Sequence, residues 1–283
     1  MKKLLLIDFS SLFHKSLHAY SDLSYKGKPT GALFGIIMQT ATGIKEIRPD
    51  KVVYCLDSPP YHRYADCGDY KHHKEQSQLT EEEAEVIDHI NRSKKICMDY
   101  LRMSGACYAV REGLEADDLI AIYTHLSHDY GEVVAMSNDS DLYQLFIHLK
   151  FSLYKGTKKG FYTAKDFFEE FGITPHSWNE VTSMTGGHNG LPGIKGIGIK
   201  TALRIIKEPE FREKKKELLI NNKNLILLNR RLTRLPYYKL REWSEVFLEE
   251  KGGDKPSEKE LIRYLSKYGI SFSSFFRDAN DQL

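Results

Sequence analysis

Four consecutive apolar residues, Leu4-Leu5-Leu6-Ile7, end at Asp8 near the start of the chain. Three later apolar runs likewise end at or lead to acids, which are Asp57, then Glu115, Asp117 and Asp118, then Asp139 and Asp141. Short β-rich runs separated by helical patterns predict an α/β fold with a mainly parallel sheet flanked by helices. Such sheets bind ligands at the carboxyl ends of their strands. We therefore expect all seven carboxylates at one sheet edge.

Seven carboxylates at one edge would repel one another unless a cation neutralised them. Hard oxygen ligands in this number suit Mg²⁺ or Mn²⁺. Each group also has a structural explanation: the third lies at the start of an expected helix at 116–122, and the fourth flanks Ser140 in a turn or N-cap sequence. Recurrence of the pattern after four strands favours the metal site.

Composition is that of an ordinary folded chain. With 283 residues, 41% hydrophobic and 28% charged, the sequence predicts a sizeable α/β domain and a smaller one. No apolar run approaches the roughly 20 residues that span a bilayer, and no cleavable signal is recognised, so we expect a cytoplasmic protein without a membrane partner. The cysteines lack metal-ligand spacing and are expected to be reduced packing thiols, without zinc or disulfides: Cys55, Cys67, Cys97 and Cys107.

Positive charge is concentrated late in the sequence, although the net charge is only +2. Residues 191–216 hold eight Lys or Arg against three Glu, and residues 221–241 hold six Lys or Arg and no acid. A basic face beside a carboxylate-bound metal suits a polyanion that is gripped and then cut. The alternative is a locally basic helix surface without a ligand.

The stretch Gly193-Ile194-Lys195-Gly196-Ile197-Gly198 predicts a glycine hairpin that enters a helix. Its glycines permit tight turns and close backbone approach, and the helix start offers free N–H groups to a phosphate. Lysines there add charge without base specificity. The candidate DNA-binding residues are Gly193, Lys195, Gly196, Gly198, Lys200 and Thr201. A purely structural turn is the alternative.

Six segments together resemble the 5′-nuclease family of phage 5′-exonucleases, flap endonucleases and the N-terminal domain of bacterial DNA polymerase I. They follow the family's order and spacing across roughly the first 205 residues, and are Leu6-Ile7-Asp8, Leu56-Asp57, Asp69-Tyr70-Lys71, Gly113-Leu114-Glu115-Ala116-Asp117-Asp118-Leu119, Ser137-Asn138-Asp139-Ser140-Asp141-Leu142 and the stretch from Leu191 to Ala202. Later segments resemble the family's C-terminal helices only loosely.

The resemblance implies a PIN-like nuclease domain at 1–178 and a region at 179–283 that contains a helix–three-turn–helix duplex-binding motif. It implies metal-dependent hydrolysis of DNA near a 5′ flap, 5′ end or junction, by a monomer in a bacterial cell or phage-infected host. Asp8, Asp57, Glu115 and Asp117 would hold the first of two divalent ions, with Asp118, Asp139 and Asp141 towards the second. Asp117 would thus be catalytic. The hairpin is compatible with the K⁺ site of the family.

The family also places a helical gateway for a single-stranded 5′ end at about 61–105. Here Tyr61-His62-Arg63-Tyr64 and Tyr70-Lys71-His72-His73-Lys74 mix cations with aromatic rings suited to DNA, and a capping box at Thr80 opens a helix. Lys71 matches a position that would stabilise phosphate charge in the transition state. Lys74 replaces the usual Arg, so a bidentate clamp becomes a point charge.

One segment departs from the family. Members typically carry Gly-Asp-x-x-Asp-Asn before the hairpin, whereas this chain has Gly186 and Asn189 in place of the two aspartates. The second ion should be weakened, and restoring both aspartates should tighten it. His188 or Asn189 would compensate best with Mn²⁺. Two functions remain open: an active structure-specific 5′-nuclease, and a DNA-junction-binding protein whose catalysis has lapsed.

Overall fold

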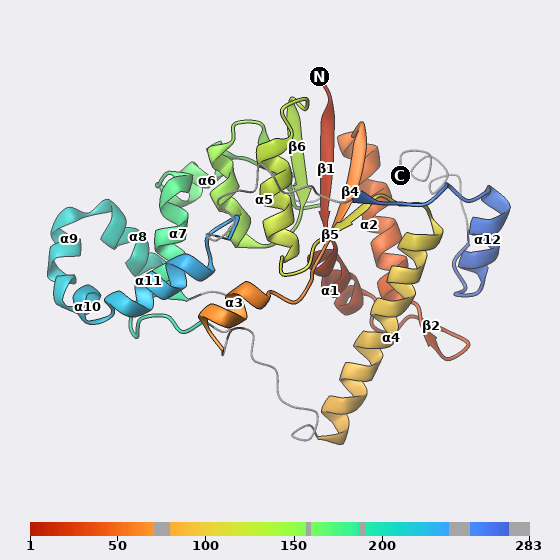
Figure 1. The fold of residues 1–283 in the computed structure, drawn as a ribbon, viewed down its shortest axis with the longest axis horizontal. Coiled ribbons are helices and arrows are strands. Elements are labelled where there is room, and N and C mark those ends of the chain that lie inside the picture. Colours follow the sequence, from red (N-terminus) through yellow and green to blue (C-terminus); the bar gives the residue numbers. More distant parts are fainter. Residues whose placement is uncertain (69, 71–79, 157–159, 187–190, 238–249, 272–283) are drawn as a thin grey trace.

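A seven-stranded sheet forms the centre of the molecule (Figure 1). The structure is a computed structural model that describes residues 1–283 except 69, 71–79, 157–159, 187–190, 238–249 and 272–283. The strand order is β8 (Phe161–Tyr162), β7 (Phe151–Tyr154), β6 (Glu132–Met136), β1 (Lys3–Asp8), β4 (Lys51–Leu56), β5 (Tyr108–Val110) and β9 (Glu250–Lys251). The five inner strands are parallel, and the two edge strands pair antiparallel. A separate hairpin joins β2 (Ser24–Tyr25) to β3 (Lys28–Pro29).

Strand β1 is apolar from Leu4 to Ile7 because both of its faces are covered. Leu4 and Leu6 belong to one buried cluster, and Leu5 and Ile7 belong to the cluster on the opposite face. The first face is covered by α5 (Ala116–Leu126), α6 (Ala164–Phe171) and α7 (Trp178–Thr185); the second is covered by α1 (Phe9–Ala19), α2 (Gly31–Ile47), α4 (Glu81–Met103) and α12 (Glu258–Ser266). Parallel strands buried in this way read as continuous apolar runs rather than as alternation.

The remaining helices extend from the first face of the sheet (Figure 1). They are α3 (Tyr61–Asp66), α8 (Ile199–Lys207), α9 (Pro209–Lys214), α10 (Lys216–Asn221) and α11 (Lys223–Leu232), with 3₁₀ segments η2 (Ser140–Ile147) and η3 (Pro175–Ser177). Ile194, Ala202 and Ile205 lie in the same buried cluster as Leu4 and Leu6. The apolar core therefore continues past residue 178, and the division at that residue stays a prediction.

The predicted α/β fold with a mainly parallel sheet is confirmed. The helix expected at 116–122 is α5, and the capping box of α4 is formed: the backbone N–H of Glu83 donates to Thr80 Oγ1 at 3.2 Å, and that of Thr80 to Glu83 Oε2 at 3.0 Å. All four cysteines are free thiols. Among the described residues, no helix combines the length and apolarity needed to cross a bilayer.

Candidate metal centre and nucleic-acid interface

The carboxyl ends of the parallel strands carry a pocket of about 390 Å³. Five of the seven candidate metal ligands line it, together with two serines, a histidine and an asparagine. The acids are Asp8, Asp57, Glu115, Asp117 and Asp139, and the other polar residues are Ser10, Ser11, His14 and Asn138. We call this space the acidic pocket. Its position follows from the topology, because β1, β4, β5 and β6 run parallel and so end at the same edge.

Helix starts orient several of these acids. Asp8 caps α1, since its Oδ1 accepts from Ser11 N at 3.0 Å, and its Oδ2 accepts from Ser137 Oγ at 2.7 Å. Asp139 caps η2 by accepting from the backbone N–H of Asp141 at 2.8 Å. The capping explanation is therefore confirmed at Asp139, and Asp8 caps a helix as well. It is compatible with the metal explanation, because a capped carboxylate keeps lone pairs for a cation.

Asp57 and the start of α5 are joined in the same way. Asp57 Oδ1 accepts from Ala116 N at 2.8 Å, and its Oδ2 accepts from the hydroxyl of Ser10. One strand end is thereby fixed to the helix that carries Glu115 and Asp117. Oxygen atoms of Glu115, Asp117 and Asp118 lie within 4.8 Å of one another, which is a spacing that one metal ion can bridge.

The side of the acidic pocket that opens to solvent, which we call the open side, carries negative charge that the lining residues do not neutralise. Burial, together with the charges of Asp57 and Asp139, raises the pKa of Asp8 to about 7. Burial and the neighbouring Asp118 raise the pKa of Asp117 well above its usual value, and Arg63 opposes that shift. No lysine or arginine is among the described residues that line the pocket. A divalent cation with oxygen ligands fits this set, since it would favour the ionised carboxylates.

Arg63 supplies the counter-charge on the buried side. Its guanidinium bonds both oxygens of Asp118, at 2.5 and 3.0 Å, and lies 2.9 Å from Glu115 Oε2. Asp118 also accepts from the backbone N–H of Tyr237 at 2.9 Å. Asp118 is fully buried and is not on the pocket wall, so its oxygens as placed serve Arg63. Its assignment to a second ion stays a prediction.

The expectation that Arg63 is a gateway cation for DNA is wrong. Arg63 is 2% exposed, its Nε donates to the carbonyl of Leu232 at 3.0 Å, and its guanidinium lies 5.0 Å from the ring centroid of Tyr237. Tyr61 and Tyr64 on the same helix are exposed. The sequence did contain a signal for a buried cation. Three acids occur within four residues, at Glu115, Asp117 and Asp118, and a carboxylate that is buried there needs a cationic partner.

Tyr70 is a second residue that the sequence left without a specific role. Its side chain is buried, and its hydroxyl donates to Glu115 Oε2 at 2.8 Å. It therefore orients a carboxylate of the acidic pocket. Four candidate residues lie outside the described part of the chain and remain predictions: Lys71, Lys74, His188 and Asn189.

Asp141 is not among the residues that line the acidic pocket. It is 5% exposed, and its backbone carbonyl accepts from Gln144 Nε2 at 3.1 Å. Its assignment to the second ion, like that of Asp118, stays a prediction.

Gly186 has a structural reason to be glycine. It ends α7 with φ +75°, and a Cβ atom at this position would lie 2.3 Å from the carbonyl oxygen of Leu191 and 2.7 Å from the nitrogen of Gly193. The backbone that opposes it leaves no room for a side chain. This packing opposes an aspartate at residue 186, and the effect of restoring the aspartates at residues 186 and 189 stays a prediction.

The glycine hairpin presents its polar groups outward. Ile194 and Ile197 are buried and anchor it, while Lys195 and Lys200 are exposed. Gly196 has φ +84°, and Gly198 caps α8. The hairpin therefore offers exposed cations and the unpaired N–H groups of a helix start to a ligand.

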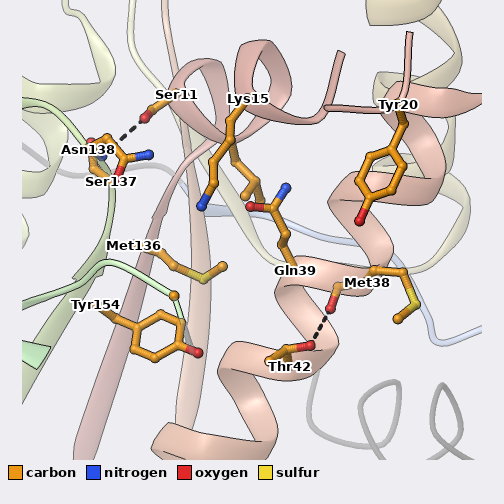
Figure 2. A pocket seen from close by; sticks show the side chains of 12 residues that line it. Ser11, Lys15, Tyr20, Met38, Gln39, Thr42, Met136, Ser137, Asn138 and Tyr154 are labelled. Atoms are coloured by element: carbon orange, nitrogen blue, oxygen red, sulfur yellow. Dashed lines mark hydrogen bonds between the residues drawn. The ribbon is translucent and has the colours of Figure 1, made fainter. Parts of the chain in front are cut away.

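A further pocket of about 230 Å³ adjoins the acidic pocket and shares Ser11 and Asn138 with it. Lys15 from α1 and Gln39 from α2 reach into it beside Tyr154 of β7 (Figure 2). The backbone N–H of Asn138 donates to Ser11 Oγ at 3.2 Å and closes the wall between the two spaces. Lys15 therefore lines a space that adjoins the acidic pocket but is not among the residues that line the acidic pocket itself.

Comparisons with known proteins agree with this geometry. The family model described as "5′-3′ exonuclease, N-terminal resolvase-like domain" matches residues 3–172. The 5′-3′ exonuclease of Aquifex aeolicus is 28% identical over 211 residues, which are 74% of this chain and 70% of that protein. The corresponding protein of Bacillus subtilis is 29% identical over 219 residues, which are 74% and 71%. The thermostable DNA polymerase I of Thermus aquaticus is 28% identical, but the match spans only 24% of it.

Solved structures share the fold. The T5 5′-exonuclease with bound zinc ions matches with a TM-score of 0.70, at 21% identity over 99% of each chain. Flap endonuclease-1 from Methanococcus jannaschii matches with a TM-score of 0.54, at 17% identity over 99% of this chain and 91% of that one. These likenesses show a common architecture, and the family model covers more than half of the sequence. The chain belongs to the 5′-3′ exonuclease family.

Proposed function

We propose that this chain is a structure-specific 5′-nuclease that hydrolyses DNA phosphodiesters near 5′ ends, flaps or junctions with divalent metal. The observation that carries the proposal is the acidic pocket, where five carboxylates meet at one sheet edge without a lysine or arginine in the described lining. Its support is family membership and relatives named 5′-3′ exonuclease. A T5 flap endonuclease of the same fold is described in complex with DNA and metal ions.

We assign the carboxylates of the acidic pocket to metal ions according to where each one lies. Asp8, Asp57, Glu115 and Asp117 would hold the firm ion, and Asp139 faces the same space from η2. A divalent ion there supplies an activated water and stabilises the leaving oxygen. The chain's own contribution is orientation: Ser137 fixes Asp8, and Tyr70 fixes Glu115. Mg²⁺ and Mn²⁺ are the proposed ions, with the second site weakened.

DNA would be held by groups that do not read sequence. The exposed hairpin, with Lys195, Lys200 and the start of α8, suits backbone phosphates, and its carbonyls suit K⁺. Lys71 directly follows Tyr70, so its place in the chain is one residue from a side chain that touches the acidic pocket. We assign it the phosphate-stabilising role, with Lys74 as a further contact.

A lapsed DNA-junction-binding protein is the second candidate. The observation that favours it is Gly186, whose backbone packing excludes the family's carboxylate at that position. A weaker second ion would lower the rate while leaving the DNA-binding surfaces intact.

Cleavage of an end-labelled 5′-flap DNA in Mg²⁺, Mn²⁺ or EDTA tests the proposal directly. We expect metal-dependent cutting near the junction, and we expect Asp117→Ala to reduce it by about a thousandfold or more while duplex affinity is unchanged. Glu112→Ala is a matched control, because this acid lies outside the acidic pocket. Tight flap binding without cutting would support the lapsed protein, and cutting that survives Asp117→Ala would refute the metal assignment.

A further inference from the structure

A second concave site lies beside α11, outside the acidic pocket and the hairpin. It has a volume of about 480 Å³, within the range of about 300–1,000 Å³ that is usual for ligand pockets. Its lining comes from η2, η3, α7, α11 and the segment that follows α11: Gln144, Ile147, Pro175, His176, Asn179, Leu227, Arg230, Arg231, Arg234 and Leu235. Three arginines and no carboxylate are among these residues. We call it the arginine pocket.

The arginines differ in how their charge is balanced. Arg231 lies 3.0 Å from Asp66 and is thereby oriented. Arg230 and Arg234 are exposed, and neither forms an ion pair or side-chain hydrogen bond within the described residues. Four exposed arginines elsewhere have carboxylate partners, whereas Arg48 and Arg263 have none within the described residues: the pairs are Arg92 with Asp88, Arg102 with Asp99, Arg204 with Glu208 and Arg212 with Glu180. The arginine pocket therefore concentrates uncompensated positive charge.

The floor of this pocket is fixed by hydrogen bonds. Gln144 Nε2 donates to the carbonyl of Thr233 at 2.9 Å, and the backbone N–H of Leu235 donates to Gln144 Oε1 at 3.4 Å. Asn179 Nδ2 donates to Thr233 Oγ1 at 2.9 Å. Arg234 thus extends from a backbone that is already held, which lowers the ordering cost of binding an anion.

The same floor connects to the metal centre. Gln144 also donates to the backbone carbonyl of Asp141, and the segment continues from Leu232, which accepts from Arg63, to Tyr237, which donates to Asp118. Hydrogen bonds that involve backbone groups therefore connect the arginine pocket to the residues that support the carboxylate cluster.

We propose that the arginine pocket binds a backbone phosphate of the DNA away from the bond that is cut. This rests on the proposed function. The chemistry matches a nucleic-acid strand rather than a free anion, because Ile147 and Leu227 expose apolar surface at the pocket beside Arg230 and Arg234, and a strand alternates phosphates with apolar sugar faces. Guanidinium groups favour phosphate through paired N–H donors.

The test is the salt dependence of flap-DNA binding in EDTA for the full chain and for Arg230→Ala/Arg234→Ala. The matched control is Lys2→Ala/Arg48→Ala, which removes two exposed charges, one just before β1 and one at the end of α2. We expect the pocket variant to weaken binding roughly tenfold and to lower the slope of log affinity against log salt by about one to two. The control should leave the slope unchanged, and equal melting temperatures would confirm folding.

A phosphate scan locates the contact. In flap DNA with one phosphate at a time replaced by a neutral methylphosphonate, one or two positions should weaken wild-type binding but no longer weaken binding by the pocket variant. An unchanged slope and unchanged scan, with cleavage still lost in Asp117→Ala, would overturn the pocket while leaving the nuclease proposal intact. A wild-type protein that neither binds nor cuts flap DNA would overturn both. Loss of binding to an acidic peptide, but not to DNA, would assign the pocket to a protein partner instead.

Discussion

The two sides of the carboxylate cluster are neutralised in opposite ways. On the buried side, Asp118 and Glu115 face Arg63, and the protein provides the compensating charge itself. On the open side, burial and neighbouring acids raise the pKa values of Asp8 and Asp117, and Arg63 only partly opposes the shift at Asp117. A dense cluster of carboxylates is therefore not a metal site on all of its sides. The side that faces away from Arg63 is suited to an external ion, and Glu115 belongs to both sides because it lines the acidic pocket as well as facing Arg63.

Replacing the buried cation Arg63 should have the largest effect on stability. We expect Arg63→Met to lower the free energy of unfolding by about 3–5 kcal/mol, because Asp118 would remain buried and unpaired. Denaturant unfolding of Arg63→Met and of Arg63→Met/Asp118→Asn measures this. The double variant should regain part of the loss, since the uncompensated charge is gone. A change within about 1 kcal/mol for the single variant would show that Asp118 does not depend on Arg63.

The raised pKa of Asp8 on the open side should make the stability of the protein depend on pH. Asp8 has a folded-state pKa of about 7, raised from its ordinary value of 3.8, so the folded protein holds a proton that the unfolded chain has released between these values. Stability in EDTA should therefore fall as pH rises from about 4 to about 7. Asp8→Asn should flatten this dependence, and Mg²⁺ should restore stability above pH 7 in the wild type. The measurement is denaturant unfolding across pH, and an equal slope in Asp8→Asn would contradict the assignment.

Adding a carboxylate at Gly186 should have the smallest effect on stability of these changes. We expect Gly186→Asp to cost about 1–3 kcal/mol, because its Cβ would meet the Leu191 carbonyl and its φ is +75°. Cleavage in Mg²⁺ should not rise. Gly68→Asp is the control, since a Cβ there meets nothing within 4 Å. A stable Gly186→Asp variant with higher Mg²⁺ activity would show that the backbone rearranges to admit a ligand.

Sequence predicted the sheet and much of the acidic pocket for one physical reason. Parallel strands end at one edge, so an apolar run followed by an acid carries three-dimensional information, as Leu4 to Asp8 does. The Arg63–Asp118 pair spans 55 residues, and the Arg63–Leu232 bond spans 169. No local period encodes contacts at such separations. The edge strands β8 and β9 could not be predicted from the sequence either, because two residues are too few to show the alternation of apolar and polar side chains that marks a strand.

The family pattern and the packing of the backbone lead to different explanations of why residue 186 is glycine. The replaced aspartate suggested a ligand lost and ready to be restored. The close approach of Leu191 and Gly193 instead makes glycine a requirement of the backbone. Only the packed structure distinguishes these explanations.

The backbone bonds of the segment after α11 set a lower limit on the smallest working fragment. A chain cut at residue 178 would retain every described acid of the acidic pocket, yet it would lack the Leu232 carbonyl that accepts from Arg63 and the Tyr237 N–H that donates to Asp118. Truncation, gene splitting or fusion at that point would preserve the ligands and remove their support. A catalytic unit defined by its acids alone would thus end too early, and the segment through Tyr237 belongs to it.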